Sequence, residues 1–386
     1  MLTRLKKALA KPAPTPETPA DRPIYLISFA SYPNYGDELI TLRWLRHLAA
    51  VRPHTPVWLD VREPGLATSL FAGAHPQLRV TNTLFRAIHE HLNGDPRTPA
   101  DKIKNLSSPF YDLGLLDLRA AGSIHLLGGG YLNSIWPNNQ LLVEAVRAAR
   151  DISGARLYAT GQGLAPLTGE KLADFDHLSV RDSPSAQALG IPKGLDDAFL
   201  LEPGTDKKPT PPQGQEPNLY LCIQEDALAS GGHQALVDYT RAQVKHWGIP
   251  RERTYYLEAI PGRDYPGYRA LQDLVGPGNF IPFAHFWREG FTYRPQDIWI
   301  TSRFHHHLNA ALHGARGVAL NGNPGYYDVK HQSILDLGSR WALASPLEGR
   351  APLIGLTDLA APDDFSSYVQ AKREEAHRLY PPLNPA

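Results

Sequence analysis

Three things are scarce in this sequence of 386 residues: cysteine, an excess of charge of either sign, and long apolar runs. The single cysteine, Cys222, cannot by itself form an intramolecular disulfide or a thiolate metal site, which indicates a reducing compartment. Lys plus Arg and Asp plus Glu each number 39, so the formal net charge is zero and nothing favours nucleic acid as a partner. No apolar run reaches the roughly 18 residues of a membrane-spanning helix, and we expect no such span.

The N-terminal tail, residues 1–23, is basic at first and then rich in proline. A helix over Met1–Lys11 would place leucines on one face among basic side chains. That arrangement suits an anionic membrane surface, and it equally suits a solvated chain end. The tail has no apolar core like that of a secretory signal, and Pro12–Pro23 is expected to be a semi-extended tether. We therefore expect a cytoplasmic protein, with contact at the inner face of the membrane as an open alternative.

The length and the alternation of elements predict two α/β domains with parallel sheets. The chain is long enough for two ordinary domains, each with its own core. Strands and helices alternate over residues 24–201 and again over residues 218–360. Residues 202–217, rich in Pro, Gly and Lys, are the expected linker. Residues 361–386 form a C-terminal helix and tail, whose amphipathic part, Asp363–Tyr380, can pack back across both domains.

Short apolar runs rich in β-branched and aromatic residues predict the strands, and 3.6-residue periodicity predicts the helices. The predicted strands are Ile24–Ala30, Val57–Val61, Ser123–Leu127, Ala155–Thr160, His177–Arg181, Leu219–Ile223, Thr254–Glu258, Phe280–Pro282, Ile298–Thr301 and Gly317–Leu320, and predicted helices include Asn138–Arg150, His233–His246 and Tyr268–Val275. Glu90–Pro109 is polar and interrupted by glycine and proline, which favours a surface loop. His285–Pro295 carries aromatic rings beside arginine, and this composition suits stacking on a sugar as well as packing at an interface.

The stretch from residue 297 to 320 gathers several candidate functional groups. A buried strand over Ile298–Thr301 is followed by Ser302, which can cap the next helix. Arg303 and His305 would then stand at the carboxyl edge of a sheet, beside a helix N-terminus. This combination suits a small dianion that requires proton transfer, and no acidic residue follows within the stretch to repel it. The alternative is a capped helix whose histidines face solvent.

Turns in the first half carry further candidates. Gly36 permits a close backbone approach, and Asn34 could meet a ligand across a cleft. Asp37 or Glu38 could accept hydrogen bonds from sugar hydroxyls, although helix capping alone also explains them. Glycines 128–130 follow a predicted strand and could leave backbone N–H groups open to a ligand, or form a tight turn only.

Two more cations and a histidine run complete the candidates. Arg181 ends a predicted strand and should face the ligand crevice, whereas Lys330, in a loop with Tyr326 and Tyr327, could be a second cation or a charge flanking a helix. In the run His305–His307, helical neighbours point about 100° apart, so three adjacent imidazoles cannot readily face one ion. We expect no required metal.

Read together, these segments resemble the polysaccharide pyruvyl transferase family. The matching pieces are Asn34-Tyr35-Gly36-Asp37-Glu38, Gly128-Gly129-Gly130 with Leu132, Gly161-Gln162-Gly163-Leu164-Ala165-Pro166-Leu167, Val180-Arg181-Asp182 with Ser185, Asp197, Ser302-Arg303-Phe304-His305, and Tyr327 with Lys330. They occur in the family's order over most of the chain. Phe304 departs from the leucine more common in the family but keeps an apolar side chain at that position.

The resemblance implies two Rossmann-like domains facing a cleft, as in GT-B glycosyltransferases, with the C-terminal helix packing back across them. It also implies transfer of pyruvate from phosphoenolpyruvate to two hydroxyls of a sugar, which gives a cyclic ketal on a surface glycan or its lipid-linked precursor. Phosphoenolpyruvate would be a co-substrate, and no cofactor is expected. The resulting candidates are His305 and Asp37 as catalytic residues, Arg181, Arg303, Phe304, Lys330, Gly129 and Gly130 for the donor, and Asn34, Glu38 and Tyr327 for the acceptor.

The residue types suit this chemistry independently of the family. The planar fork of arginine binds carboxylate and phosphate bidentately, and a histidine that titrates near neutrality can both give and take protons. One rival is a GT-B glycosyltransferase using a nucleotide-sugar, which the acid-free stretch after Arg303 disfavours. The other is a non-catalytic saccharide-binding protein, against which the presence of Arg181, Arg303 and His305 counts. Glu90–Pro109 and His285–Pro295 are expected to select the acceptor.

Overall fold

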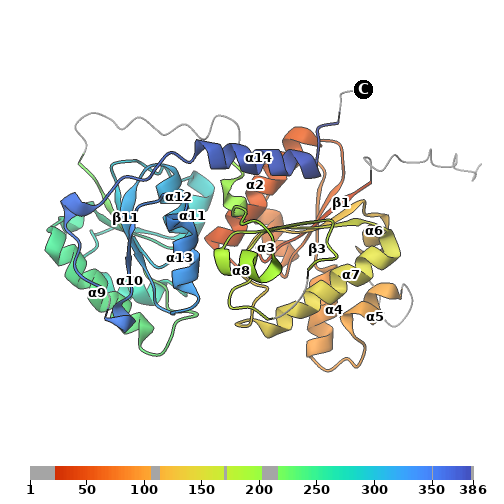
Figure 1. The fold of residues 1–386 in the computed structure, drawn as a ribbon, viewed down its shortest axis with the longest axis horizontal. Helices are drawn as coiled ribbons and strands as arrows, with labels where there is room; N and C mark the ends of the chain where they lie inside the picture. Colours follow the sequence, from red (N-terminus) through yellow and green to blue (C-terminus); the bar gives the residue numbers. More distant parts are fainter. Residues whose placement is uncertain (1–21, 106–113, 169–171, 202–215, 350, 384–386) are drawn as a thin grey trace, which may run out of the picture.

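The computed structural model describes residues 22–105, 114–168, 172–201, 216–349 and 351–383. These residues form two α/β domains side by side, each built on a parallel six-stranded sheet (Figure 1). The expected tail and linker lie almost wholly outside the described residues, so the structure does not test them. Of the helices in the described ranges, none has the length and hydropathy needed to cross a membrane.

The first sheet has the strand order β3-β2-β1-β4-β5-β6. Its strands are β1 Ile24–Ile27, β2 Val57–Asp60, β3 Leu78–Thr81, β4 Ser123–Leu126, β5 Arg156–Gln162 and β6 His177–Val180. All residues of the central strands β1 and β4 are buried, as expected for a parallel sheet covered by helices on both faces. The helices of this domain are α2 Tyr35–Val51, α3 Pro64–Leu70, α4 Thr83–Leu92, α5 Pro99–Lys104, α6 Gly114–Ala120, α7 Leu141–Ser153 and α8 Ser183–Leu189, with 3₁₀ turns η1 Pro137–Gln140 and η2 Asp197–Phe199.

The second sheet repeats this order, β12-β11-β10-β7-β8-β9, when its strands are counted from β7. Its strands are β7 Leu219–Cys222, β8 Thr254–Leu257, β9 Phe280–Ile281, β10 Ile298–Thr301, β11 Arg316–Leu320 and β12 Ala342–Ala344. The helices of the second half are α9 Gly232–Trp247, α10 Tyr265–Leu271, α11 Phe283–Glu289, α12 Phe304–Leu312, α13 Tyr327–Leu335 and α14 Ser366–Leu379, with 3₁₀ turns η3 Arg251–Arg253, η4 Pro346–Glu348 and η5 Leu356–Asp358.

The shared strand order fixes where ligands can bind. In a doubly wound sheet the chain departs to opposite sides from the two central strands, and a crevice opens beyond their carboxyl ends. Here those strands are β1 and β4 in the first domain and β7 and β10 in the second. The turns that follow these four strands are therefore the parts of the fold best placed to form a site.

Two element predictions were wrong. Glu90–Pro109, expected to be a loop, contains the end of α4 and the helix α5, which begins with a capping box between Thr98 and Asp101. Lys102 of α5 is buried and its ammonium lies 2.9 Å from the carboxylate of Glu90, so this segment packs against the domain. Strands β3 and β12 were not predicted. Both are edge strands; β3 carries the exposed Arg79 within its short apolar run, and β12 is only three residues long.

The domains meet through apolar packing. One hydrophobic cluster extends from Trp44 of α2 in the first domain to Trp299 of β10 in the second. The side chain of Tyr35 reaches across to Tyr293, with 2.9 Å between their hydroxyl oxygens, and its backbone N–H donates to the carbonyl of Ala259 (3.0 Å). The aromatic segment around Tyr293 and Phe286 is buried here, so the structure supports interface packing rather than sugar stacking for His285–Pro295.

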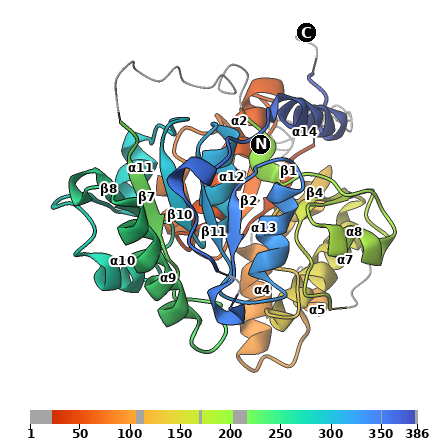
Figure 2. The same ribbon diagram turned by 60° about the vertical axis from the view of Figure 1, so that its left-hand side comes forward.

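Helix α14 crosses from the second domain onto the first, as the sequence predicted, and lies beside α2 in both views (Figures 1 and 2). It is anchored by Lys372, whose ammonium contacts the carboxylates of Asp197 (2.5 Å) and Glu375 (2.6 Å). The side chains of Lys372 and Asp197 are wholly buried. Glu375 also faces His177 at the end of the first sheet, with 2.8 Å between Oε1 and Nε2.

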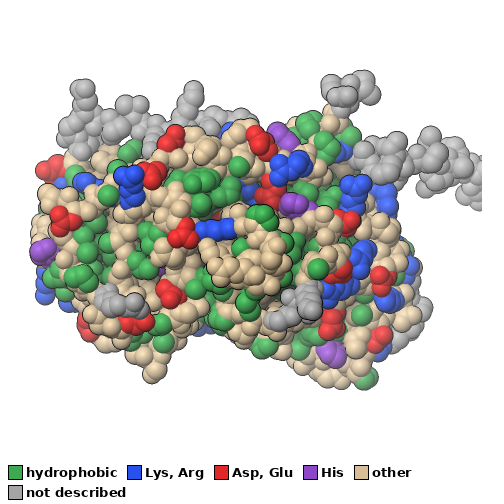
Figure 3. All heavy atoms as spheres, in the orientation of Figure 1, with side chains coloured by type: hydrophobic (Ala, Val, Ile, Leu, Met, Phe, Trp, Pro, Cys, Tyr) green, Lys and Arg blue, Asp and Glu red, His purple; other side chains and the backbone are tan. Residues whose placement is uncertain are grey.

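The outer surface shows no extended area of one charge on the face seen in Figure 3, where acidic and basic side chains alternate. This agrees with the formal net charge of zero.

Candidate functional site

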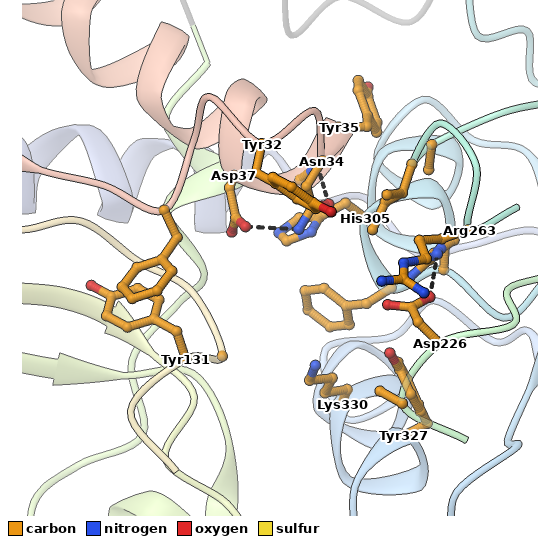
Figure 4. Close-up of a pocket in the computed structure, with 18 of the residues that line it drawn as sticks. Tyr32, Asn34, Tyr35, Asp37, Tyr131, Asp226, Arg263, His305, Tyr327 and Lys330 are labelled. Atoms are coloured by element: carbon orange, nitrogen blue, oxygen red, sulfur yellow. Dashed lines mark hydrogen bonds and ion pairs between the residues drawn. The ribbon is translucent and has the colours of Figure 1, made fainter. Parts of the chain in front are cut away.

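The main candidate site is a cavity of about 500 Å³ between the two domains. Most of its wall comes from the segments that follow β1, β4, β7 and β10, so it opens where the strand order predicts a ligand crevice. Segments after other strands add Arg181, Tyr327 and Lys330. Figure 4 labels Asn34, Asp37 and Tyr131 from the first domain, and Asp226, Arg263, His305, Tyr327 and Lys330 from the second. In this view His305 lies beside Asn34 and Asp37, against the opposite domain.

Most of the residues predicted from sequence meet in this cavity. Those that line it are Asn34, Asp37, Gly130, Arg181, Arg303, Phe304, His305, Tyr327 and Lys330. Gly129 lies behind the wall, where its carbonyl accepts a hydrogen bond from the backbone N–H of Gly163 (2.8 Å).

Glu38 is the clearest exception. Its side chain is fully buried, and its carboxylate accepts hydrogen bonds from the backbone N–H groups of Ser31 (2.9 Å) and Asn34 (3.4 Å). Burial raises the pKa of Glu38 to about 8. The prediction that Glu38 binds the acceptor was therefore wrong: it supports the turn that leads into α2.

Arg303 enters the site directly from β10 and occupies the N-cap of α12. Ser302, predicted to be the cap, still belongs to the sheet, because its N–H donates to the carbonyl of Cys222 (3.1 Å). The hydroxyl of Ser302 accepts a hydrogen bond from the backbone N–H of Gln224 (3.0 Å). The helix therefore starts one residue later than predicted, without a side-chain cap.

Two carboxylates hold the guanidinium of Arg303. Asp264 accepts from Nε (2.8 Å) and Nη2, and Asp226 accepts from Nη2 (2.6 Å). Burial would lower the pKa of Arg303, but these carboxylates outweigh it and keep the group charged. They lie 39 and 77 residues away in the chain, so the acid-free sequence around Arg303 did not reveal them. The expectation of an arginine without acidic neighbours was wrong.

A second buried carboxylate, Asp196, joins two predicted site residues from different domains. Its Oδ2 accepts from Nη1 of Arg181 (2.5 Å), and its Oδ1 lies 3.5 Å from Nε2 of His305. Burial would raise the pKa of Asp196, but His305 and Arg181 outweigh it and hold the pKa well below its ordinary range. The face of Arg181 also covers the ring of Phe304, 4.5 Å from its centroid. Sequence reasoning missed Asp196 because nothing distinguishes it from the adjacent Asp197.

Gly36 explains how His305 reaches the first domain. A Cβ atom on Gly36 would lie 1.9 Å from Nδ1 of His305, so only glycine leaves room for the imidazole. Asn34 caps the same helix, accepting from the backbone N–H of Gly36 (3.3 Å). The N-terminus of α2 is therefore shaped to receive a side chain of the other domain.

The remaining glycine-rich turns serve the same purpose. Cβ atoms at Gly130 and Gly163 would come within 3.0 Å and 2.8 Å of the guanidinium of Arg181. Gly128 and Gly161 make the equivalent space for Asp197, and the N–H of Gly128 donates to that carboxylate (2.8 Å). The expected role of the triple glycine as open N–H donors is thus wrong for Gly128, whose N–H is already bonded.

A family model for polysaccharide pyruvyl transferases matches residues 34–269, more than half of the chain. The chain belongs to the polysaccharide pyruvyl transferase family. The match begins at Asn34, includes the turn after β4 and Arg181, and ends before Arg303 and His305, whose place in the site rests on the geometry above. No curated protein sequence matches the chain.

Solved structures resemble this pyruvyl transferase family member in fold. The UDP-GlcNAc 2-epimerase of Methanocaldococcus jannaschii, in complex with UDP-GlcNAc and UDP, superposes with a TM-score of 0.50 at 9% identity over 92% of this chain and 99% of that one. The UDP-GlcNAc 2-epimerase of Neisseria meningitidis has a TM-score of 0.42 at 9% identity and covers 92% of this chain and 99% of its own. The spinosyn rhamnosyltransferase SpnG has a TM-score of 0.41 at 12% identity and covers 92% of this chain and 95% of its own. Together with the two parallel sheets, the first likeness confirms the predicted GT-B-like arrangement of two Rossmann-like domains.

Two further ionisable groups face the cavity. Burial raises the pKa of Asp37, although His305, Arg181 and Lys330 oppose the shift. Burial likewise lowers the pKa of Lys330, whose ammonium lies over the ring of Tyr326, 3.7 Å from its centroid. The amide of Asn34 donates to Asp37 (2.7 Å) and orients its carboxylate.

The three consecutive histidines separate as helical geometry predicts. His306 points into the interface and stacks on Tyr35, with ring centroids 5.0 Å apart. His307 points away, stacks on Trp341 and lies 3.1 Å from the ring nitrogen of His331. Only His305 of the three faces the space between Gly36 and Asp196. Within the described residues, no group of three or more His, Cys, Asp or Glu side chains is arranged to hold a metal ion.

Proposed function

We propose that this protein transfers pyruvate from phosphoenolpyruvate to two hydroxyl groups of a saccharide, forming a cyclic ketal and releasing phosphate. Membership of the family supports transfer to polysaccharide in general. The finer statement is supported by the cations of the cavity: Arg181, Arg303 and Lys330 surround a space that fits a three-carbon molecule with a phosphate and a carboxylate. The proposed place of action is the cytoplasm, where this donor is made.

The reaction defines what the site must do. Carbon C3 of phosphoenolpyruvate gains a proton, the bond between C2 and the phosphate oxygen breaks, and two sugar oxygens bond to C2. The two hydroxyls lose one proton each: one balances the proton gained at C3 and the other leaves with the phosphate. Fixed cations stabilise the charge that develops on the departing phosphate. Because Asp264 and Asp196 hold Arg303 and Arg181, these guanidinium groups need no reorganisation.

His305 is assigned the proton transfers. It lines the same cavity as Arg181 and Arg303 and lies beside Asp37, against the turn that leads into α2. A buried carboxyl group with a raised pKa, such as Asp37, can exchange a proton with a sugar hydroxyl near neutral pH. His305 and Asp37 therefore supply an acid and a base side by side in the cavity.

One observation carries this proposal: Arg181 and His305 come from different domains and share the carboxylate of Asp196 within one cavity. An anion-binding group and a proton-transfer group are thereby held in fixed relation. This is the arrangement that an anionic donor requiring protonation needs.

The first test is substitution of His305. Wild type and His305→Ala are incubated with phosphoenolpyruvate and a panel of glycans, and the ketal methyl resonance and released phosphate are measured by NMR. Loss of general acid–base catalysis should lower turnover by about 10²- to 10⁴-fold with folding intact. The control His285→Ala changes an exposed histidine of α11 and should keep full turnover. Near wild-type turnover by His305→Ala would refute the assignment.

A binding test separates the donor classes. Phosphoenolpyruvate should raise the melting temperature, because a ligand that binds only the folded state stabilises it, whereas UDP-GlcNAc should not. The reverse result would favour a nucleotide-sugar glycosyltransferase.

A further inference from the structure

A second cavity, of about 720 Å³, adjoins the first and lies wholly within the first domain. The two share four wall residues, Phe29, Arg62, Trp136 and Asn139. Beyond this shared wall the second cavity runs between α4 and the turn η1, where amides and aromatic rings line it. Its size is that of a small-molecule site, and a ligand in the first cavity can extend into it without leaving the protein surface.

The exposed aromatic side chains mark the same region. Among the described residues, the aromatics that stay exposed as large apolar side chains are Tyr32 (60%), Trp136 (45%) and Tyr265 (42%). Tyr32 and Trp136 both line the first cavity, and Trp136 belongs to the shared wall. Two exposed aromatic rings at one cavity form an apolar surface suited to the apolar face of a sugar ring.

Arg62 adds a preorganised donor at the junction. Its guanidinium lies over the rings of Phe29 (4.7 Å) and Phe85 (5.7 Å), and Nη2 donates to the amide oxygen of Asn139 (3.3 Å). In the described chain this guanidinium is held by aromatic faces and an amide, unlike Arg181 and Arg303, which are held by carboxylates. Its N–H groups therefore remain suited to the oxygen atoms of a glycan.

We propose that the second cavity is a binding subsite for the sugar units that adjoin the one receiving pyruvate, so that the acceptor is a glycan of at least two sugars. The reacting ring occupies the first cavity beside Asp37 and His305, and the next ring stacks on Trp136 within reach of Arg62. This inference rests on the proposed function. It replaces the expectation that His285–Pro295 selects the acceptor, because Phe286 and Tyr293 of that segment are buried at the interface. It keeps one end of the other expected segment, Glu90–Pro109, because Leu92 lines the second cavity.

The test compares acceptor lengths. Mono-, di- and tetrasaccharides of glucose, galactose, mannose, N-acetylglucosamine and glucuronate are assayed for binding by saturation-transfer NMR and for ketal formation. Wild type should bind di- and tetrasaccharides at least about tenfold more tightly than the monosaccharides. Trp136→Ala should reduce that preference about tenfold, and Asn138→Trp, which fills only the second cavity, should abolish it. The control Tyr265→Ala removes an equally exposed ring outside both cavities and should leave the preference unchanged.

The outcomes distinguish this inference from the proposed function. Equal binding of short and long glycans, no glycan binding at all, or an unchanged preference in both variants overturns the subsite. Length-dependent glycan binding that both variants lose, without any ketal formed from phosphoenolpyruvate, leaves the subsite standing and refutes the proposed function. Length-dependent ketal formation supports both.

Discussion

The two sheets share one strand order, but the residues at their carboxyl edges differ in size. At the edge of the first sheet, Gly36, Gly130 and Gly163 leave space where side chains would normally be. At the edge of the second sheet, β10 runs straight into the large side chains of Arg303 and His305 at the start of α12. Gly36 makes room for His305 of the second domain, whereas Gly130 and Gly163 make room for Arg181 of the first. The candidate site therefore forms where both domains meet.

This difference shows why glycine-rich turns are ambiguous in a sequence. In nucleotide-binding folds such turns expose backbone N–H groups to phosphate. Here they admit charged side chains of the protein itself, which then carry the site's chemistry. Substitutions can test this arrangement in three ways. They can weaken the contact between the domains, fill the space beside a glycine of the first sheet, or change a charged or titratable group at the junction.

Removing the buried ion pair that anchors α14 to the first domain should give the largest loss of stability. Lys372→Met removes the buried partner of Asp197 on α14 and leaves an uncompensated buried carboxylate, which costs about 3–5 kcal/mol. Urea unfolding should show this loss. The control Lys104→Met breaks an ion pair with Asp151 whose side chains are half exposed, and it should cost less than about 1 kcal/mol. Equal effects of the two substitutions would contradict the anchoring role of Lys372.

A side chain added at Gly36 should inactivate the protein without unfolding it. In Gly36→Ala the new methyl group collides with the ring of His305, and a displacement of about 1 Å can cost about 100-fold in turnover. Steady-state kinetics and the melting temperature are measured together. Gly65→Ala, where no atom lies within 4 Å of the new Cβ, is the matched control and should keep full activity. Activity of Gly36→Ala within threefold of wild type would show that the contact is unimportant.

Removing one charge at the junction should have a smaller effect. Asp196→Asn keeps an oxygen for Arg181 but loses the charge facing His305, and turnover should fall about 10- to 100-fold. Ring ¹⁵N shifts of His305 should change as well, which a purely structural role would not produce. Asp182→Asn is the control, since asparagine caps α8 as well as aspartate does. Unchanged ring shifts in Asp196→Asn would mean that Asp196 only fills space.

The smallest effect is expected for stability at low pH, from His306, to which no proton transfer is assigned. Burial lowers the pKa of His306 to about 3, so below pH ~6.5 the unfolded chain takes up a proton that the folded chain refuses. The neutral, buried His306 side chain therefore contributes fully to stability above that pH, and this contribution is lost as the pH falls toward 3. His306→Phe should therefore be more stable than wild type at pH 5 by about 1–2 kcal/mol and equal at pH 7.5. Thermal unfolding at both pH values measures this, and His54→Phe, an exposed position, should show no such gain.

The sequence predicted the elements and site residues that depend on short-range patterns. Ile298–Thr301 coincides with β10, and Arg181 follows β6 as expected, because apolar runs and strand ends are short-range patterns. The partners of the arginines were not predictable in this way, since Asp264 and Asp226 reach Arg303 only through the fold. Glu38 was misassigned for the related reason that burial of a carboxylate depends on the turn around it.

The carboxylate of Asp197 has a consequence for how the protein is made. Donors from Trp44, Gly128 and Thr160 converge on it early in the chain, but its counterion, Lys372, is synthesised only after the whole second domain. The first domain therefore leaves the ribosome with an unbalanced interior charge and must wait for the last helix to dock. If Lys372 is what the isolated first domain lacks, then adding residues 361–383 as a separate peptide should stabilise that domain.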